Sequence, residues 1–252
     1  MNDEFHPQAG GSLDSFRRAA VVVGLLFITA TVVTILSLPL VESLLDPVEA
    51  PEFFVNVSAD EGRIVAGALL FLVCAVAVIL IPVVMFPIFK KHNEALALGY
   101  LAFRIVEGVT IVATVVSWLL LITLSKEYVA AEAPDASHFE TTGVLLTESG
   151  IWIGYMLSLF LSLGSIVFFY MLHQTRLVHR VLTLWGLAGG VLHLVGTAGL
   201  MFGSFADDSA LGVLTVLPLA LVEMVLAAWL IIKGFDPSAI AELSEGDSKA
   251  VD

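Results

Sequence analysis

Cysteine and charged residues are both scarce in this chain. Cys74 is its one cysteine and lies in an apolar segment, so a scaffold held by disulfide bonds is excluded. Charged residues make up 14% of the 252 residues, whereas soluble domains have about 25%. Basic residues are the scarcest, with 11 Lys and Arg against 24 Asp and Glu. This balance argues against binding to nucleic acid, whose partners present basic patches.

Common catalytic and cofactor motifs are also missing. The chain has no Gly-rich phosphate loop, no Gly-x-Ser-x-Gly turn and no Cys-x-x-Cys pair. Haem held between helices would need two facing histidines, but His193 is the one histidine deep in an apolar segment. Zinc hydrolysis needs about three clustered ligands, which here would have to be Glu107, His193 and Glu223. We therefore predict no cofactor and no metal site, and an intramembrane lipid-modifying enzyme stays a remote alternative.

Apolar residues, by contrast, are abundant. They make up 58% of the chain, against about 45–50% in soluble domains. A helix that crosses a bilayer needs about 20 mostly apolar residues. The segments that satisfy this requirement are 19–40, 62–89, 98–124, 149–172, 181–203 and 210–232. We predict an all-α polytopic membrane helix bundle, with six transmembrane helices over residues 19–235 and polar tails at 1–18 and 236–252.

Lysine and arginine are distributed unevenly between the two sides of the predicted bundle. If the N-terminus is inside, the cytoplasmic side holds eight of these residues: Arg17, Arg18, Lys90, Lys91, Arg176, Arg180, Lys233 and Lys249. The outer side then holds Arg63 and Lys126. Short cytoplasmic segments carry an excess of Lys and Arg. We therefore predict that both termini are cytoplasmic, in a protein of the cell membrane whose partner is the lipid bilayer.

The outer connections, at 41–61 and 125–148, are long and acidic. Each contains an apolar patch, Phe53–Val55 in the first and Phe139 in the second, which we expect to lie on the membrane surface or to cap the bundle. The acidic outer face is either a vestibule that attracts cations or simply a solvated surface. After Ile240 the chain is polar, and we expect a frayed end.

Four ionisable residues interrupt the apolar spans: Arg104, Glu107, His193 and Glu223. Counting from the inner ends of their helices puts all of them roughly 10–18 Å deep, so they share one layer. Arg104 and Glu107 are three residues apart and lie on one helix face, which Tyr100 continues. Because lone charges in hydrocarbon are costly, we predict that Arg104 pairs with Glu107, Glu223 or both.

Small residues follow regular stripes on the fifth and fourth predicted spans. Around His193 the stripe consists of Gly186, Gly189, Gly190, Gly196, Gly199 and Gly203, and on the preceding span it consists of Gly154, Ser158, Ser162 and Ser165. Such stripes let helix backbones approach each other closely. We interpret both as tight helix packing with some polar contacts.

Several segments resemble one known family. They are Leu98–Glu107, Leu182–Gly186, Glu223–Leu230 and Lys233–Ile240. The chain resembles, over about residues 15–242, a prokaryotic integral-membrane family catalogued as domain of unknown function 4386. The resemblance implies a multi-span bundle without an assigned activity. It also places Arg104, Glu107 and Glu223 inside the motifs of that family.

Two functions fit the ionisable layer. The first is a small-solute or ion transporter, or a related binding protein, that uses Arg104, Glu107 and Glu223. The second is a structural or regulatory membrane protein in which the layer is an internal ion-paired lock. With one Arg and two Glu, the layer lacks one proton for neutrality if His193 is neutral, and we expect Glu223 to take that proton. A water-accessible layer favours the first function and a dry layer the second.

Overall fold

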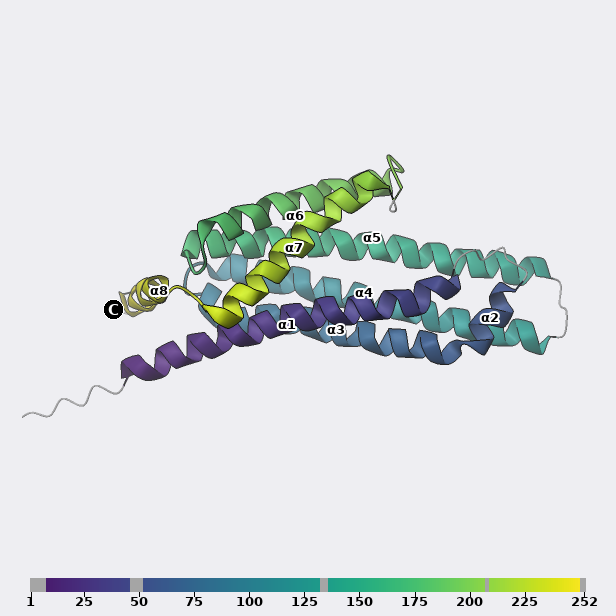
Figure 1. The fold of residues 1–252 in the computed structure, drawn as a ribbon, viewed down its shortest axis with the longest axis horizontal. Coiled ribbons are helices and arrows are strands. Elements are labelled where there is room, and N and C mark those ends of the chain that lie inside the picture. The colour runs from purple at the N-terminus through teal and green to yellow at the C-terminus, as the bar shows by residue number, and fades with distance from the viewer. Residues whose placement is uncertain (1–7, 46–51, 132–135, 207–208, 250–252) are drawn as a thin grey trace, which may run out of the picture. The chain divides into compact units, whose positions relative to one another are not determined.

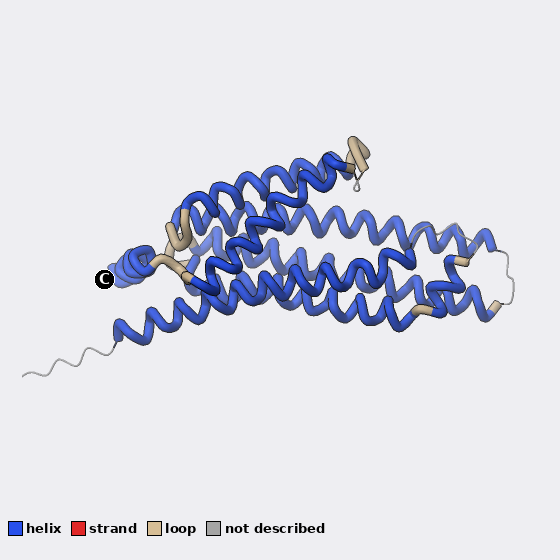
Figure 2. The backbone as a smooth tube through the Cα atoms, viewed as in Figure 1, coloured by secondary structure: helices blue, strands red, loops and turns tan. Residues whose placement is uncertain are grey.

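The computed structural model describes residues 8–45, 52–131, 136–206 and 209–249, and in these ranges the regular structure is entirely helical (Figure 2). The helices are α1 (Gln8–Leu45), α2 (Phe53–Ala59), α3 (Glu61–Phe89), α4 (Glu94–Ala130), α5 (Ala136–Thr175), α6 (Arg180–Met201), α7 (Ala210–Ile232) and α8 (Pro237–Lys249) (Figure 1). The predicted all-α class is confirmed.

Six of these helices, α1 and α3 to α7, are long and apolar enough to cross a membrane. Each of them overlaps one of the six predicted spans. Large apolar side chains stay exposed along them, among them Leu69, Val109 and Val195. Exposed apolar side chains of this kind suit contact with lipid rather than water. The protein is a multi-pass membrane protein.

The helix ends differ from the predicted span ends. Residues 125–148 were expected to form a long connection, but α4 continues to Ala130 and α5 already begins at Ala136. Likewise the expected frayed end after Ile240 is wrong, since α8 runs on to Lys249. Hydropathy indicates where contact with lipid ends. It does not indicate where the backbone hydrogen bonds of the helix end. The sequence also predicts a tight outer turn at Asp207 and Asp208, but these two residues lie outside the described ranges.

The chain forms two compact units, and the first comprises residues 1–28, 79–104 and 161–252. Aromatic rings occupy its core. The ring of Phe168 on α5 stacks on Tyr100 of α4, with 5.1 Å between centroids, and also contacts Phe27 of α1 and Phe89 of α3. Phe168 and Tyr100 are both buried. One α5 side chain thus connects three other helices of this unit.

In the same unit, most of the predicted glycine stripe is a packing surface of α6, but Gly203 lies beyond the end of the helix and faces open space among the described residues. Gly186 faces the Phe169 ring of α5, and Gly196 faces the Thr215 side chain of α7. A Cβ atom at either glycine would come within 2.3 Å of those neighbours. The absent side chains allow α6 to pack against both α5 and α7.

The second unit comprises residues 29–78 and 105–160. In it the Ser37 hydroxyl on α1 donates to the Gly67 carbonyl of α3 at 2.8 Å. Phe54 of α2 packs against Tyr128 of α4 and Phe139 of α5, with centroids 4.8 and 6.4 Å away. Its side chain is 3% exposed. Of the two positions expected for these apolar patches, the structure therefore shows the capping one for Phe54.

Candidate functional site

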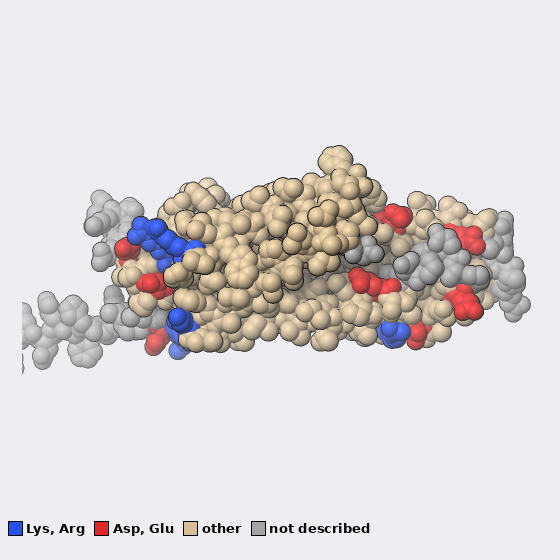
Figure 3. Space-filling model, turned by 45° about the horizontal axis from the view of Figure 1, so that its top comes forward, with Lys and Arg blue, Asp and Glu red and all other residues tan. Residues whose placement is uncertain are grey.

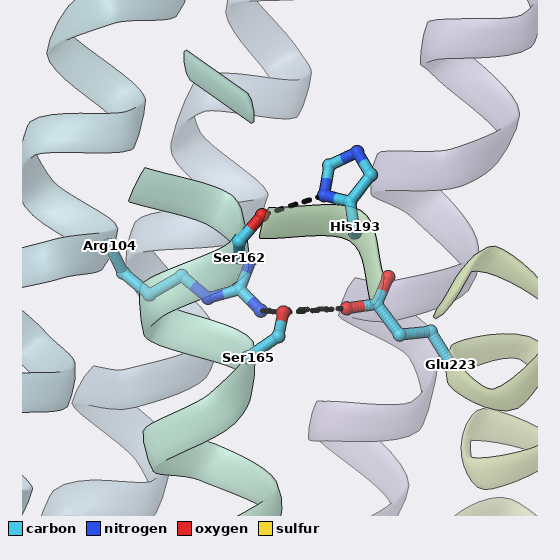
Figure 4. Close-up of polar contacts among 5 residues, drawn as sticks. All are labelled: Arg104, Ser162, Ser165, His193 and Glu223. Carbon is cyan, nitrogen blue, oxygen red and sulfur yellow. Dashed lines mark hydrogen bonds and ion pairs between the residues drawn. The ribbon is translucent and has the colours of Figure 1, made fainter. Parts of the chain in front are cut away.

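A buried arginine lies at the centre of the candidate site, on α4 of the first unit. The Arg104 side chain is 2% exposed, and its Nη2 atom lies 3.7 Å from Oε1 of Glu223 on α7 (Figure 4). The Glu223 side chain is 14% exposed. The pairing of Arg104 with Glu223, which the sequence led us to expect, is therefore present. It connects the first unit's part of α4 to the middle of α7.

A serine connects the two charged groups. Ser165 of α5 accepts a hydrogen bond from Nη2 of Arg104 at 3.4 Å and donates one to Oε1 of Glu223 at 3.3 Å. Its hydroxyl lies between the guanidinium and the carboxylate (Figure 4). The sequence placed Ser165 only in a packing stripe. Its role depends on a third helix passing between the two charges, which spacing along one helix does not show.

The histidine of the layer has its own serine partner. Nδ1 of His193 on α6 lies 2.8 Å from the Ser162 hydroxyl of α5. Both side chains are buried. Because Ser162 and Ser165 are three residues apart, they lie on one face of α5. We call Arg104, Ser162, Ser165, His193 and Glu223 the polar cluster.

Tyr100 lies one helical turn from the arginine. The guanidinium carbon of Arg104 lies 5.6 Å from the centroid of the Tyr100 ring, within the range of a cation–π contact. Gly164 of α5 also packs against the arginine, because a Cβ at this glycine would lie 3.5 Å from Nε of Arg104. The ring and the glycine together enclose the guanidinium in protein.

Glu107, the remaining predicted site residue, belongs to the second unit. Its side chain is buried, and its backbone carbonyl accepts a hydrogen bond from the Thr110 hydroxyl at 2.7 Å. Among the predicted site residues, Arg104 therefore contacts both Glu223 and Tyr100. In the described ranges, no three His, Cys, Asp or Glu side chains are grouped so that they could hold a metal ion.

Residues 22–234 match a family model whose description is Domain of unknown function (DUF4386). The chain belongs to this family. No curated protein and no solved structure matches it. The matched region of this DUF4386 protein contains the whole polar cluster and all of α3 to α7. Because the family description gives no activity, the function has to be argued from the geometry of the site.

Proposed function

We propose that this DUF4386 protein is a small-solute or ion transporter, or a related binding protein, and that a cation or proton binds at the polar cluster. An arginine at the centre of a membrane helix costs at least about 2.5–3.5 kcal/mol on insertion scales. Apolar residues of similar volume are often as stabilising as a buried ion pair, or more so. Stability alone is therefore a weak reason for Arg104 and Glu223 to occupy these positions.

The loose coupling between Arg104 and Glu223 carries the proposal. A tight charge-assisted hydrogen bond measures about 2.7–2.9 Å, whereas these groups are 3.7 Å apart and share Ser165 at 3.4 and 3.3 Å. The Glu223 side chain is also more exposed than that of Arg104, at 14% against 2%. A carboxylate that is held loosely by its counter-ion, and is less enclosed than that counter-ion, is suited to exchanging it for a small cation or a proton.

The charge balance of the spans supports the same proposal. Glu107 and Glu223 carry two negative charges when ionised, and Arg104 carries one positive charge. With His193 neutral, the spans lack one positive charge. A bound proton or a monovalent cation would supply it. The substrate class that follows is a cation, or a solute that moves together with one.

The alternative is an internal lock in a structural or regulatory membrane protein. The enclosure of Arg104 favours it, because the guanidinium contacts the Tyr100 ring, and that ring stacks on Phe168 in the closed core. In a lock, the polar cluster would hold α4, α5 and α7 together and exchange nothing.

For orientation, we propose that both termini are cytoplasmic in the cell membrane. The support is the distribution of basic residues, because eight of them lie on one side of the predicted spans while Arg63 and Lys126 lie on the other.

Ion flux through purified protein in sealed vesicles separates the two functions. We would impose gradients of H⁺, Na⁺ or K⁺ in turn and follow the ion inside with an indicator dye. Transport predicts flux in the wild type, loss of flux in Glu223→Gln and unchanged flux in Glu148→Gln, an exposed glutamate on α5. A lock predicts no protein-dependent flux.

A double-mutant cycle on stability tests the lock directly. If the pair only holds helices, Arg104→Met and Glu223→Met should each destabilise the protein, and the double variant should recover most of the loss. Recovery in the double variant together with absent flux would reject transport.

A further inference from the structure

A cavity of about 480 Å³ opens at one end of the first unit, where α5 and α7 end and α6 and α8 begin. Its volume lies within the range of small-molecule sites, about 300–1,000 Å³. Part of its lining is apolar and buried, from Leu177, Val178 and Phe235. The cavity lies at the ends of membrane spans, and its lining contains no residue of the polar cluster.

The charged residues of the lining are mainly basic. Arg176, Arg180 and Lys233 line the cavity with exposed side chains, against one acid, Asp236. Hydrogen bonds from the Ser238 hydroxyl and the Ser238 backbone N–H lower the pKa of Asp236. This carboxylate is therefore charged, and its hydrogen bonds are made with the first turn of α8. Three positive charges against one negative charge leave the cavity positive. Figure 3 shows basic side chains gathered at the end of this unit that carries α8.

Backbone contacts fix the two loops that form the cavity. The backbone N–H of Asp236 donates to the Leu177 carbonyl at 2.9 Å, which joins the α5–α6 connection to the α7–α8 connection. The Lys233 ammonium lies 4.3 Å from the centroid of the Trp229 ring. Gly234 follows with φ 77°, a conformation that favours glycine and turns the chain toward α8. The basic side chains are therefore presented by a defined frame.

Arg176 occupies a backbone position that would suit glycine better. It follows α5 with φ 54°, the left-handed conformation in which helices commonly end at glycine. A side chain at such a position is disfavoured sterically. Backbone geometry therefore does not favour an arginine at this position, and its side chain lines the basic cavity.

We propose that this cavity binds a phosphate group, and that the headgroup of an anionic phospholipid supplies it. Guanidinium groups match phosphate geometry and bind it through paired hydrogen bonds. Basic pockets between helices at a membrane face are suited to anionic lipid headgroups. The apolar lining beside the basic residues would contact the lipid's glycerol and acyl carbons. The proposal stands independently of the function proposed for the polar cluster.

The test measures binding of short-chain phosphatidylglycerol, short-chain phosphatidylcholine and inorganic phosphate to the purified full-length protein. In Arg176→Gly, the affinity for phosphatidylglycerol should fall about tenfold or more, as expected for a lost charge-assisted contact. Thermal stability should be unchanged or higher, because glycine relieves the left-handed conformation. Arg18→Gln removes an exposed basic charge outside the cavity and should leave the affinity unchanged.

The three probes distinguish the source of the phosphate group. Tighter binding of phosphatidylglycerol than of inorganic phosphate, lost in Arg176→Gly, supports a lipid ligand. Equal binding of both, again lost in Arg176→Gly, supports the phosphate site and assigns it to a free phosphorylated solute. Wild-type affinity in Arg176→Gly, an equal loss in Arg18→Gln, or equally tight binding of phosphatidylcholine would overturn the proposal.

Discussion

The Nη2 atom of Arg104 lies 3.7 Å from Oε1 of Glu223, and the Ser165 hydroxyl hydrogen-bonds to both. The three residues come from α4, α7 and α5. A single hydroxyl therefore contacts two opposite charges and connects three helices of the first unit. Removing it should weaken this connection while both charges remain.

We expect Ser165→Ala to lower the free energy of unfolding by about 0.6–1.7 kcal/mol, which are the average and the maximum measured for interhelical hydrogen bonds in a membrane protein. Reversible unfolding of the purified protein in detergent would measure this. Ser149→Ala is the control on the same helix, because its hydroxyl is exposed and donates to the Leu145 carbonyl one turn earlier. Equal losses in both variants would show that the bridge adds nothing.

Two glycines of the first unit should respond oppositely to the same substitution. A Cβ at Gly186 would lie 2.2 Å from the buried ring of Phe169, so Gly186→Ala should cost about 1–3 kcal/mol of stability. Gly99 on α4 has no neighbour within 4 Å of its Cβ position, so Gly99→Ala should add up to about 1 kcal/mol. Thermal unfolding of both variants checks this. Shifts of the same sign would contradict the proposed packing of α6 against α5.

The six spans could be predicted because their signal is the length of each apolar segment. A helix has to satisfy its backbone groups internally wherever it meets lipid. Beyond the lipid this requirement ends, and polar residues that continue a helix look the same in sequence as residues of a loop. The extensions of α4 to Ala130 and of α8 to Lys249 were missed for this reason.

The site could be predicted in part for a related reason. Arg104 and Glu223 stand out because charges are rare in the spans, and their cost in hydrocarbon implies a partner. Serines give no such signal, since Ser162 and Ser165 also fit a packing stripe. The basic cavity depends on the hydrogen bond between Asp236 and Leu177, which lie far apart in sequence. Only the folded chain brings Arg176 and Lys233 to the same cavity.

Arg17 should stabilise the end of α7, in contrast to its neighbour Arg18. Its guanidinium donates to the carbonyls of Leu230, Ile231 and Ile232, at 3.0, 2.7 and 3.3 Å. Carbonyls in the last turn of a helix lack intrahelical partners, and a cation near them is favourable. We expect Arg17→Gln to lower stability by about 1–3 kcal/mol, as hydrogen bonds to charged groups typically contribute.

The control for this prediction is Arg18→Gln, which removes the same charge from an exposed position on α1. Thermal unfolding at high salt strengthens the comparison, since screening weakens exposed charges more than hydrogen-bonded ones. A loss in Arg18→Gln as large as in Arg17→Gln would mean that overall charge, and not the contact with α7, is responsible.

The proposed orientation can be tested by labelling cysteines in intact cells. The background would be Cys74→Ala, since Cys74 is the one native cysteine and is buried. If both termini are cytoplasmic, Asp207→Cys should react with a membrane-impermeant maleimide from outside, and Lys90→Cys should react only after permeabilisation. The physical reason is the excess of basic residues on the same side as Lys90, which favours retention of that side in the cytoplasm.

Labelling of Lys90→Cys but not Asp207→Cys in intact cells would reverse the topology. It would also place the basic cavity beside Arg176 on the outer face, where its phosphate ligand would have to come from the outer leaflet.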